Sequence, residues 1–259
     1  MHQTGAITGY IDVAQVTLYA FWAFFGALVF YLRREDKREG YPLISDRSDN
    51  VRVEGFPPMP APKTFLLRDG RTYQAPPGVI DTRHVAAEPA ERFPGAPLHP
   101  TGNPLVDGVG PASYAMRDDL PELTAENETR CVPLRVATDF GVDENDPDPR
   151  GMQVVGADGV VAGVVRDIWI DRSEPGIRYF EADIPTGEGT RTVLVPINFS
   201  RVDGDRRVVR VAALKAAQFA EIPGTKYPDE VSAREDDRIT GYFGGGTLYA
   251  DPQRAEPIL

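Results

Sequence analysis

The longest hydrophobic run of the chain lies close to its start, at residues 13–32. Its twenty residues carry no formal charge, and a helix of that length is about 30 Å long, which matches the hydrocarbon core of a bilayer. A cleaved signal peptide needs Lys or Arg before the run, and residues 1–12 contain neither. A buried core helix is the other structure that such a run can form. We predict a helix over residues 13–32 that spans a membrane once.

A cluster of cations follows the run directly. Residues 33–38 read RREDKR, and the basic side chains are Arg33, Arg34, Lys37 and Arg38. Because Lys and Arg collect on the cytoplasmic side of membrane helices, we expect the large C-terminal part in the cytoplasm and residues 1–12 in the periplasm. The same four cations are candidates for binding anionic lipid headgroups, each contributing about 1 kcal/mol.

Small side chains share one face of the predicted helix. Ala20, Ala23 and Ala27 follow each other at helical spacing, and small residues let two helices approach closely. This face either packs against a helix of another membrane protein or lies in lipid, with the alanines incidental. The three alanines are therefore candidates for partner-helix packing.

Proline dominates the next part of the chain, residues 33–130. Seventeen of the 24 prolines fall between Pro42 and Pro149. Proline has no amide donor and pushes its predecessor toward an extended backbone, so we predict an irregular chain with short strands such as residues 63–67. Scattered apolar side chains such as Phe56 and Phe65 favour a segment that lies over a large partner surface rather than a disordered linker. Without that partner, we expect the segment to be unordered.

The hydrophobic pattern changes again at about residue 131. Short β-branched runs separated by turn signals such as Asp158-Gly159 predict strands at residues 132–137, 152–155, 160–170, 178–184, 191–197 and 207–212. A short helix is expected at 214–220, and the three glycines at 244–246 are expected to form a turn. Strands of this number and length favour a small β-barrel, whose closure removes exposed edges. The predicted fold is a single transmembrane helix, an irregular proline-rich segment and a mainly β domain over residues 131–259.

The amino-acid composition excludes several kinds of partner and activity. The chain has 39 acidic against 28 basic side chains and a net charge of −11, which argues against a nucleic-acid partner. Its one cysteine, Cys131, excludes an intrachain disulfide and Cys-based metal sites. The sequence has no nucleophile elbow, zincin helix or Walker lysine. We therefore expect neither enzymatic activity nor a metal or cofactor bound by this chain.

Acidic side chains are the remaining candidates for a chemical role. One group, including Glu122, Glu126 and Glu128, precedes the β domain, and a second, including Asp171 and Glu174, follows the run VRDIWI. In so acidic a chain such clusters are commonly solvated surface. Carboxylates linked by water also pass protons where burial or crowding raises a pKa toward neutrality. The residues by themselves leave both interpretations open.

Several long motifs carry a resemblance to a known family. In chain order they are YLRREDKREGYPL at residues 31–43, PKTF at 62–65, PTGNPLVDGVGPASY at 100–114, RDDLPEL at 117–123 and VRDIWIDRSEPGIRYFE at 165–181. With these motifs after a spanning helix, the chain resembles the H subunit of the purple-bacterial photosynthetic reaction centre, and its β domain is similar to a PRC-barrel. The alternative function is a membrane-tethered PRC-barrel adaptor that binds a soluble partner.

The resemblance implies an accessory subunit that binds no pigment and is not an enzyme. Such a subunit caps the cytoplasmic side of the L and M subunits, shields the quinone sites and helps to deliver protons to the secondary quinone. Bacteriochlorophyll, bacteriopheophytin, quinones, carotenoid and a non-haem iron are expected in the partner subunits. A cytochrome subunit and the light-harvesting antenna are possible further partners in the photosynthetic inner membrane.

The resemblance also assigns site residues. Asp171, Glu174 and Arg178 match the family's charged positions near the secondary quinone, and Glu122 lies in the matching RDDLPEL motif. These four are the expected proton-transfer residues.

The chain departs from the family's pattern after this motif. Where the family carries histidines at the proton entry, this sequence has Glu126 and Glu128. An ordinary glutamate pKa is near 4.3, against about 6.5 for histidine, so an unperturbed glutamate holds few protons at neutral pH. We expect the two glutamates to replace the histidines as a proton-collecting pair.

Overall fold

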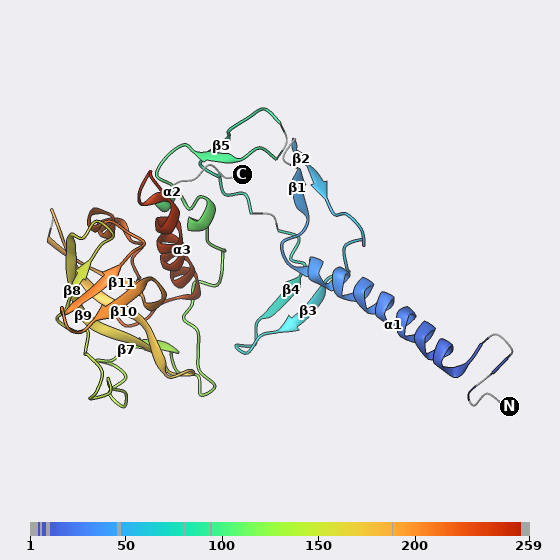
Figure 1. Cartoon of the computed structure of the whole chain (residues 1–259), viewed down its shortest axis with the longest axis horizontal. Coiled ribbons are helices and arrows are strands. Elements are labelled where there is room, and N and C mark those ends of the chain that lie inside the picture. Colours follow the sequence, from blue (N-terminus) through green and yellow to red (C-terminus); the bar gives the residue numbers. More distant parts are fainter. Residues whose placement is uncertain are drawn as a thin grey trace. The chain divides into compact units, whose positions relative to one another are not determined.

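The computed structural model describes residues 5, 7–8, 11–45, 48–79, 81–93, 95–187 and 189–254. The chain divides into two compact units, Met1–Arg83 with Phe93–Gly95 and His84–Arg92 with Ala96–Leu259. The first unit holds the N-terminal helix and two small hairpins. The second holds a third hairpin, the main sheet and the C-terminal helix (Figure 1).

The N-terminal hydrophobic run forms helix α1, Val13–Glu35. Asp12 caps it, because its carboxylate accepts a hydrogen bond from the Gln15 backbone N–H at 2.8 Å while the Gln15 side chain accepts from the Asp12 N–H at 3.2 Å. None of its residues is buried. Among the described residues, it is the one helix long and apolar enough to cross a membrane. The helix predicted over residues 13–32 is confirmed, and it continues to Glu35.

The chain leaves α1 through one turn of 3-10 helix, η1 (Asp36–Arg38), that buries a cation. Lys37 is only 1% exposed, and its ammonium donates hydrogen bonds to the backbone carbonyls of Glu54 and Pro57. The same nitrogen lies 5.2 Å from the centre of the Tyr41 ring, within cation–π range. A buried ammonium is costly unless its protons are bonded. These contacts therefore tie the end of α1 to the proline-rich segment.

Arg38 makes a second tie beside the first. Its guanidinium donates to the carbonyls of Ala61 and Ala75 at 2.9 and 2.8 Å and to the Glu35 carboxylate at 2.8 and 3.0 Å. Lys63 also donates to Glu35, at 2.6 Å. The basic turn after the helix is thus part of the internal structure of the first unit.

The described part of the proline-rich segment contains three two-stranded hairpins. They are β1 (Leu43–Ser45) with β2 (Ser48–Val53), β3 (Lys63–Leu66) with β4 (Thr72–Ala75), and β5 (Ala87–Pro89) with β6 (Leu98–Pro100), all antiparallel. The strand predicted at residues 63–67 is β3. A four-residue helix, α2 (Pro104–Asp107), and a 3-10 turn, η2 (Gly110–Ala112), follow.

The main sheet has seven strands, six of them in the order β11–β10–β9–β8–β13–β12, with β7 pairing to β9 beside this path. The strands are β7 (Cys131–Pro133), β8 (Gln153–Val155), β9 (Val161–Asp171), β10 (Gly176–Thr186), β11 (Gly189–Pro196), β12 (Ser200–Asp203) and β13 (Val208–Val211). All six predicted strands are present with shifted ends, and β12 is an additional one. The sheet curls into a half-barrel: within the described residues no pairing joins β11 to β12, so the expected closure is absent.

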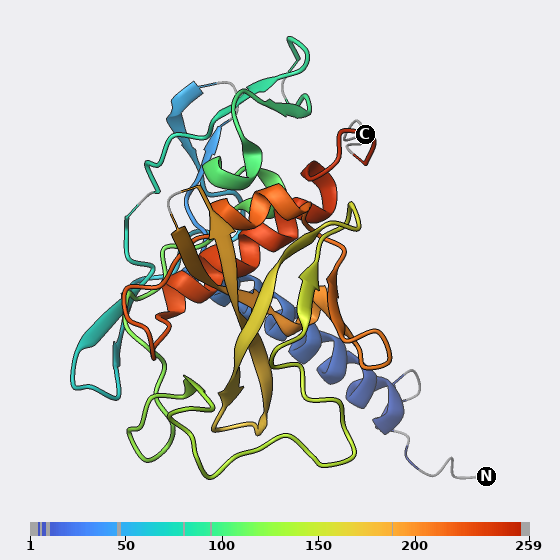
Figure 2. The same ribbon diagram turned by 90° about the vertical axis from the view of Figure 1, so that its left-hand side faces the viewer.

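The core of the second unit lies between this sheet and the C-terminal helix α3, Ala233–Tyr249. Figure 2 shows α3 running across the strands. The Phe243 ring of α3 lies 5.7 Å from Phe199 and 6.3 Å from Phe219, centre to centre. Phe219 belongs to the 3-10 helix η4 (Ala216–Glu221), which occupies the place of the helix predicted at 214–220.

The prediction of a turn at the three glycines is wrong, because α3 continues through them. Their role is close packing. A Cβ on Gly245 would lie 2.5 Å from the Ala112 Cβ, and one on Gly246 would lie 2.5 Å from the Ala213 carbonyl oxygen. A Cβ on Gly241 would also be too close, at 2.9 Å from the Ala112 carbonyl oxygen. Glycine lowers intrinsic helix propensity, but here the absence of side chains lets η2 and the segment after β13 approach the helix.

We expect Gly245→Ala to destabilise the chain by about 2 kcal/mol, the typical cost of overpacking a tight contact. At an exposed helical position the same change would stabilise by up to about 1 kcal/mol, because alanine has the higher helix propensity. Denaturant unfolding followed by circular dichroism measures the difference. Thr240→Ala, exposed on the same helix, serves as the control and should be near neutral. An unfolding midpoint that rises in Gly245→Ala would contradict the packing role.

Candidate functional site

The candidate site is built around Asp171, the last residue of β9. Two pairings place it there: Cys131 of β7 on one side and Gly176 of β10 on the other are its Cα partners. The residue is 4% exposed. Its carboxylate accepts a hydrogen bond from Arg130 Nε at 3.0 Å and one from the backbone N–H of Ser173 at 2.9 Å, and its second oxygen forms an ion pair with Arg130 at 2.7 Å. The sheet therefore holds an acid and its counter-ion at the strand end.

A tight loop brings a second carboxylate to the same place. The Thr124 N–H donates to the Glu128 carbonyl and the Arg130 N–H to the Glu122 carbonyl, each at 2.8 Å, which folds residues 122–130 back on themselves. The Glu122 carboxylate then accepts from Arg130 at 3.1 Å and from Arg117 at 3.0 Å. Arg130 consequently bridges Glu122 and Asp171.

The first turn of α3 supplies a third carboxylate. Asp236 accepts a hydrogen bond from the Tyr179 hydroxyl of β10, and an Asp236 oxygen lies 3.6 Å from a guanidinium nitrogen of Arg178. Sequence reasoning named Arg178 but missed Tyr179, Asp236 and Arg130. Asp236 is 58 positions beyond Arg178 in the chain, and only the docking of α3 on the sheet joins them.

These groups line one small hollow. Glu122, Arg130, Asp171, Arg178 and Asp236 all face a space of about 20 Å³, which is room for about one water molecule. Three carboxylates and two guanidiniums therefore surround a position where a water can bridge them. Such an arrangement can pass a proton along hydrogen bonds, and it can also hold charged strand ends together.

Burial and hydrogen bonds act in opposite directions on Asp171. Burial raises the pKa of its carboxyl, but hydrogen bonds from Arg130 and from the backbone N–H groups of Glu174 and Ser173 outweigh it, so the pKa lies below its ordinary value. Burial raises the pKa of the neighbouring Cys131 thiol to about 12. Burial, and next the Asp236 carboxylate, raise the pKa of Tyr179. Asp171 is thus ionised, and the thiol and phenol stay protonated, at neutral pH.

The other predicted proton-transfer residues lie around this hollow rather than in it. Glu174 is exposed in the turn after β9, and its backbone N–H donates to Asp171 at 3.2 Å. Glu128 is exposed and lies 3.4 Å from Arg172. Glu126 is exposed at the tip of the loop, and among the described residues its carboxylate has no ion-pair partner. The structure therefore brings Asp171, Glu122 and Arg178 together and leaves the three glutamates toward solvent.

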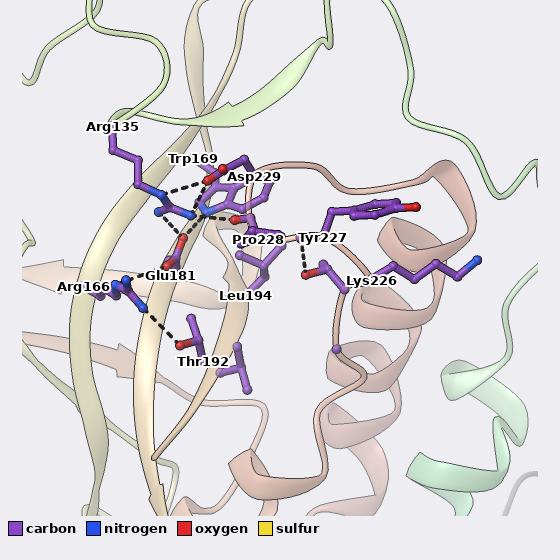
Figure 3. Close-up of a pocket in the computed structure, with 13 residues that line it drawn as sticks. Arg135, Arg166, Trp169, Glu181, Thr192, Leu194, Lys226, Tyr227, Pro228 and Asp229 are labelled. Atoms are coloured by element: carbon purple, nitrogen blue, oxygen red, sulfur yellow. Dashed lines mark hydrogen bonds and ion pairs between the residues drawn. The ribbon is translucent and has the colours of Figure 1, made fainter. Parts of the chain in front are cut away.

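A second charged cluster lies on the sheet, in a hollow of about 450 Å³ (Figure 3). Arg135 is at its centre and donates to Glu181 at 2.7 Å, to Asp167 at 3.0 Å and to Asp229 at 2.9 Å. The Trp169 indole N–H donates to the same Glu181 carboxylate at 2.7 Å. Because Glu181 is only 3% exposed, the network satisfies a carboxylate that would otherwise be buried without partners.

The predicted membrane residues differ in what surrounds them. Ala20, Ala23 and Ala27 are exposed along α1, a helix none of whose residues is buried. Arg33 and Arg34, in the last turn of α1, are also exposed.

Two of the four predicted lipid ligands, Lys37 and Arg38, are buried instead. Backbone carbonyls and Glu35 take up their donors, so in this structure the exposed cations of the basic cluster are Arg33 and Arg34.

Two known protein families match parts of this chain. Residues 5–136 match the family described as the photosynthetic reaction centre H-chain N-terminal region, and residues 142–218 match the PRC-barrel domain. The first match alone covers just over half of the chain and includes α1, the proline-rich segment and the loop that carries Glu122. The second covers strands β8 to β13 of the curled sheet and includes Asp171. The chain therefore belongs to the H-chain family of photosynthetic reaction centres.

Proposed function

We propose that this reaction-centre subunit caps the cytoplasmic side of the L and M subunits and conducts protons toward the secondary quinone that they hold. The observation that carries the proton role is the hollow between β9, β10 and α3, where three carboxylates and two guanidiniums surround room for about one water. A quinone that is reduced twice under a protein cap needs protons, and a continuous apolar cap would exclude them.

The ionised state of Asp171 fits a relay better than a proton store. Since its pKa lies below the ordinary value, Asp171 stays ionised, and its role in the proposed path is to accept a hydrogen bond from a bridging water and so orient it. Glu174 extends the path toward solvent on one side and Glu122 on the other. Arg178, the fourth expected residue, would offset the repulsion between the carboxylates.

The capping role is supported by apolar side chains that the first unit leaves uncovered. Phe56 is 81% exposed, and Leu66 and Val79 are nearly as open. Exposed apolar patches of this kind mark protein or membrane contacts. We therefore propose that the proline-rich segment, residues 33–130, lies over the partner subunits, and that residues 131–259 form the cytoplasmic domain.

Proton entry is proposed at the loop tip, where Glu126 and Glu128 replace the family's histidines. The experiment that tests this entry is proton uptake by intact reaction centres carrying Glu126→Gln/Glu128→Gln, followed with a pH-indicator dye after a flash. We expect uptake to slow at least about fivefold, because the loss of a positioned acid–base group commonly costs tenfold or more. Glu144→Gln, exposed on a different loop, is the control. Uptake at the wild-type rate in the double variant would refute the entry role.

Lipid contact is proposed for Arg33 and Arg34, the exposed cations at the end of α1. Each should contribute about 1 kcal/mol toward an anionic bilayer surface. We expect Arg33→Gln/Arg34→Gln to lower the number of phosphatidylglycerol molecules retained by the purified complex, as counted by mass spectrometry of extracted lipid. Arg68→Gln/Arg92→Gln removes the same charge from other exposed positions and should retain the wild-type number. Equal retention in both double variants would contradict the proposal.

The orientation follows from the same cations. With Arg33 and Arg34 on the cytoplasmic side, residues 1–12 lie in the periplasm, and α1 spans the inner membrane of the photosynthetic cell. Its face of Ala20, Ala23 and Ala27 is proposed to pack against a helix of L or M. A cytochrome subunit and the antenna are further proposed neighbours, and the pigments, quinones and iron belong to the partner subunits.

A further inference from the structure

The edge of the half-barrel carries an unusual pair of like charges. Arg201 of β12 and Arg210 of β13 are Cα partners in the antiparallel ladder, so their side chains start from the same face, directly opposite each other. Like charges in this position destabilise a hairpin. Asp203 lies 3.7 Å from Arg210, whereas no described carboxylate lies within ion-pair distance of Arg201. The pair therefore has room for an additional anion.

Basic charge is concentrated here although the chain as a whole is acidic. The stretch from Ser200 to Val211 holds four arginines and two aspartates, in a chain of net charge −11. Arg254, which follows α3, adds a further guanidinium, which donates to the Ala212 carbonyl at 2.8 Å. The excess of basic over acidic side chains in this stretch means that charge complementarity favours an anionic partner here.

Two hollows run along this face of the hairpin and share the arginine pair. One, of about 560 Å³, lies toward the β12–β13 turn, and the other, of about 640 Å³, lies toward α3. Arg201 and Arg210 line both. The second hollow also has apolar walls from Phe199 and Ala213. The surface thus offers guanidiniums beside a recess for an apolar side chain.

The backbone at this edge adds a third feature. β12 is the last strand of the sheet path and, among the described strands, pairs with β13 alone. An unpaired strand edge is a template for an extended peptide, which gains main-chain hydrogen bonds while its side chains enter neighbouring pockets. A recessed face with an open strand edge suits a peptide better than a lipid surface, which favours a protruding basic patch.

We infer that the β12–β13 face is a docking site for an extended acidic segment of a partner protein, with carboxylates that pair with Arg201 and Arg210 beside an aromatic or aliphatic anchor. Guanidinium groups bind carboxylates in a planar, two-bonded geometry that an ammonium cannot reproduce. This site lies apart from the hollow around Asp171 and does not depend on the proton role.

The test uses the full-length chain in detergent and a fluorescein-labelled probe peptide, Gly-Glu-Phe-Glu-Leu-Glu-Gly, followed by fluorescence anisotropy. We expect saturable binding that weakens with salt, and at least about tenfold weaker binding by Arg201→Gln/Arg210→Gln. Peptides with Gln for Glu, or with Ala for Phe and Leu, should each bind several-fold more weakly. The variant Arg201→Lys/Arg210→Lys keeps the positive charge but not the planar guanidinium, so its loss of peptide affinity should be intermediate. It also keeps the test valid if Arg201→Gln/Arg210→Gln fails to fold.

Arg68→Gln/Arg92→Gln is the matched control, since it removes the same charge from exposed positions elsewhere. Equal losses in the control and in Arg201→Gln/Arg210→Gln would overturn the inference, because they would show general electrostatic attraction. It would also be overturned if phosphatidylglycerol vesicles bound through this pair more tightly than the peptide. Self-association of the Gln variant without loss of peptide binding would show that the arginines only protect the strand edge from aggregation, and would likewise overturn it.

Discussion

Reaction centres that carry Asp171→Asn and Glu174→Gln together should transfer the second, proton-coupled electron to the secondary quinone at least about tenfold more slowly than wild type. Positioned acid–base groups typically contribute factors of about 10² to 10⁴, and parallel routes reduce the observed loss. Both amides preserve side-chain size and remove a group that exchanges protons, and Asp171→Asn also removes the ion pair with Arg130. Absorbance changes after the second of two flashes measure the rate, and transfer of the first electron should be unaffected.

The control for this pair is Glu144→Gln/Asp146→Asn, which removes two exposed carboxylates from another loop. It tests whether the rate depends on the overall negative charge of the domain. If both double variants slow the second transfer equally, the effect is electrostatic and the relay is refuted. A rate in Asp171→Asn/Glu174→Gln equal to wild type would refute it as well.

Arg130→Gln is the counterpart of this experiment, because it keeps the Asp171 carboxyl but removes its main hydrogen-bond donor. The backbone N–H groups of Ser173 and Glu174 still donate, but burial is then opposed less strongly, so the pKa of Asp171 should rise. In the wild type a lowered folded-state pKa adds stability that is complete above the unfolded value near 3.9 and is lost as pH falls through the folded value. The stability gap between wild type and Arg130→Gln should therefore be widest near pH 7, and the wild-type contribution to it should be lost only as pH falls below about 3.9, as urea unfolding at pH 7 and at about pH 3 will show.

The largest loss of stability is expected from Arg135→Met. This change leaves the carboxylates of Glu181 and Asp167 buried without their cation, and breaking a buried pair by removing one partner costs about 3 to 5 kcal/mol. The Trp169 indole would still donate to Glu181, and Arg166 lies 3.7 Å from the same carboxylate, so we expect the lower end, about 3 kcal/mol, in the free energy of unfolding. Denaturant titration followed by Trp169 fluorescence reports on the same cluster.

Two further variants test whether the loss of stability comes from the unpaired carboxylates. Adding Glu181→Gln to Arg135→Met removes one of the stranded charges and should restore part of the loss, because replacing a whole buried pair costs far less than breaking it. Arg92→Met, at an exposed position, should change stability by less than about 0.5 kcal/mol. An Arg135→Met protein as stable as this control would contradict a stabilising role for the network.

Most of the fold could be predicted because its elements have strong local periodicity. The uncharged run that forms α1 and the β-branched runs that form β9, β10 and β11 are readable without a structure. The glycines of α3 were misinterpreted for a physical reason: a glycine run normally ends a helix, and only the close approach of Ala112 and Ala213 explains their presence inside one. β12 was missed because four residues with two charges show no clear alternation.

The site was predictable only in part. Asp171, Glu122 and Arg178 were found through motif resemblance, and the structure places them at one hollow. Arg130 and Asp236 carry no local signal, since each acquires its partner through strand pairing or helix docking across tens of residues. The burial of Lys37 and Arg38 was equally hidden, because their partners are mostly backbone carbonyls, which every residue has.

The hydrogen bonds from Lys37 and Arg38 to backbone carbonyls also fix how α1 is rotated about its own axis. Since each residue of an α-helix adds about 1.5 Å along the axis and about 100° around it, the distance in sequence from these two residues determines which side of the helix faces a given direction. One residue inserted between Leu32 and Lys37 would turn the alanine face by about 100° and displace it by about 1.5 Å. Both changes are relative to residues 54–75, which supply the carbonyls. The buried cations thus determine which way the alanine face of α1 points relative to residues 54–75.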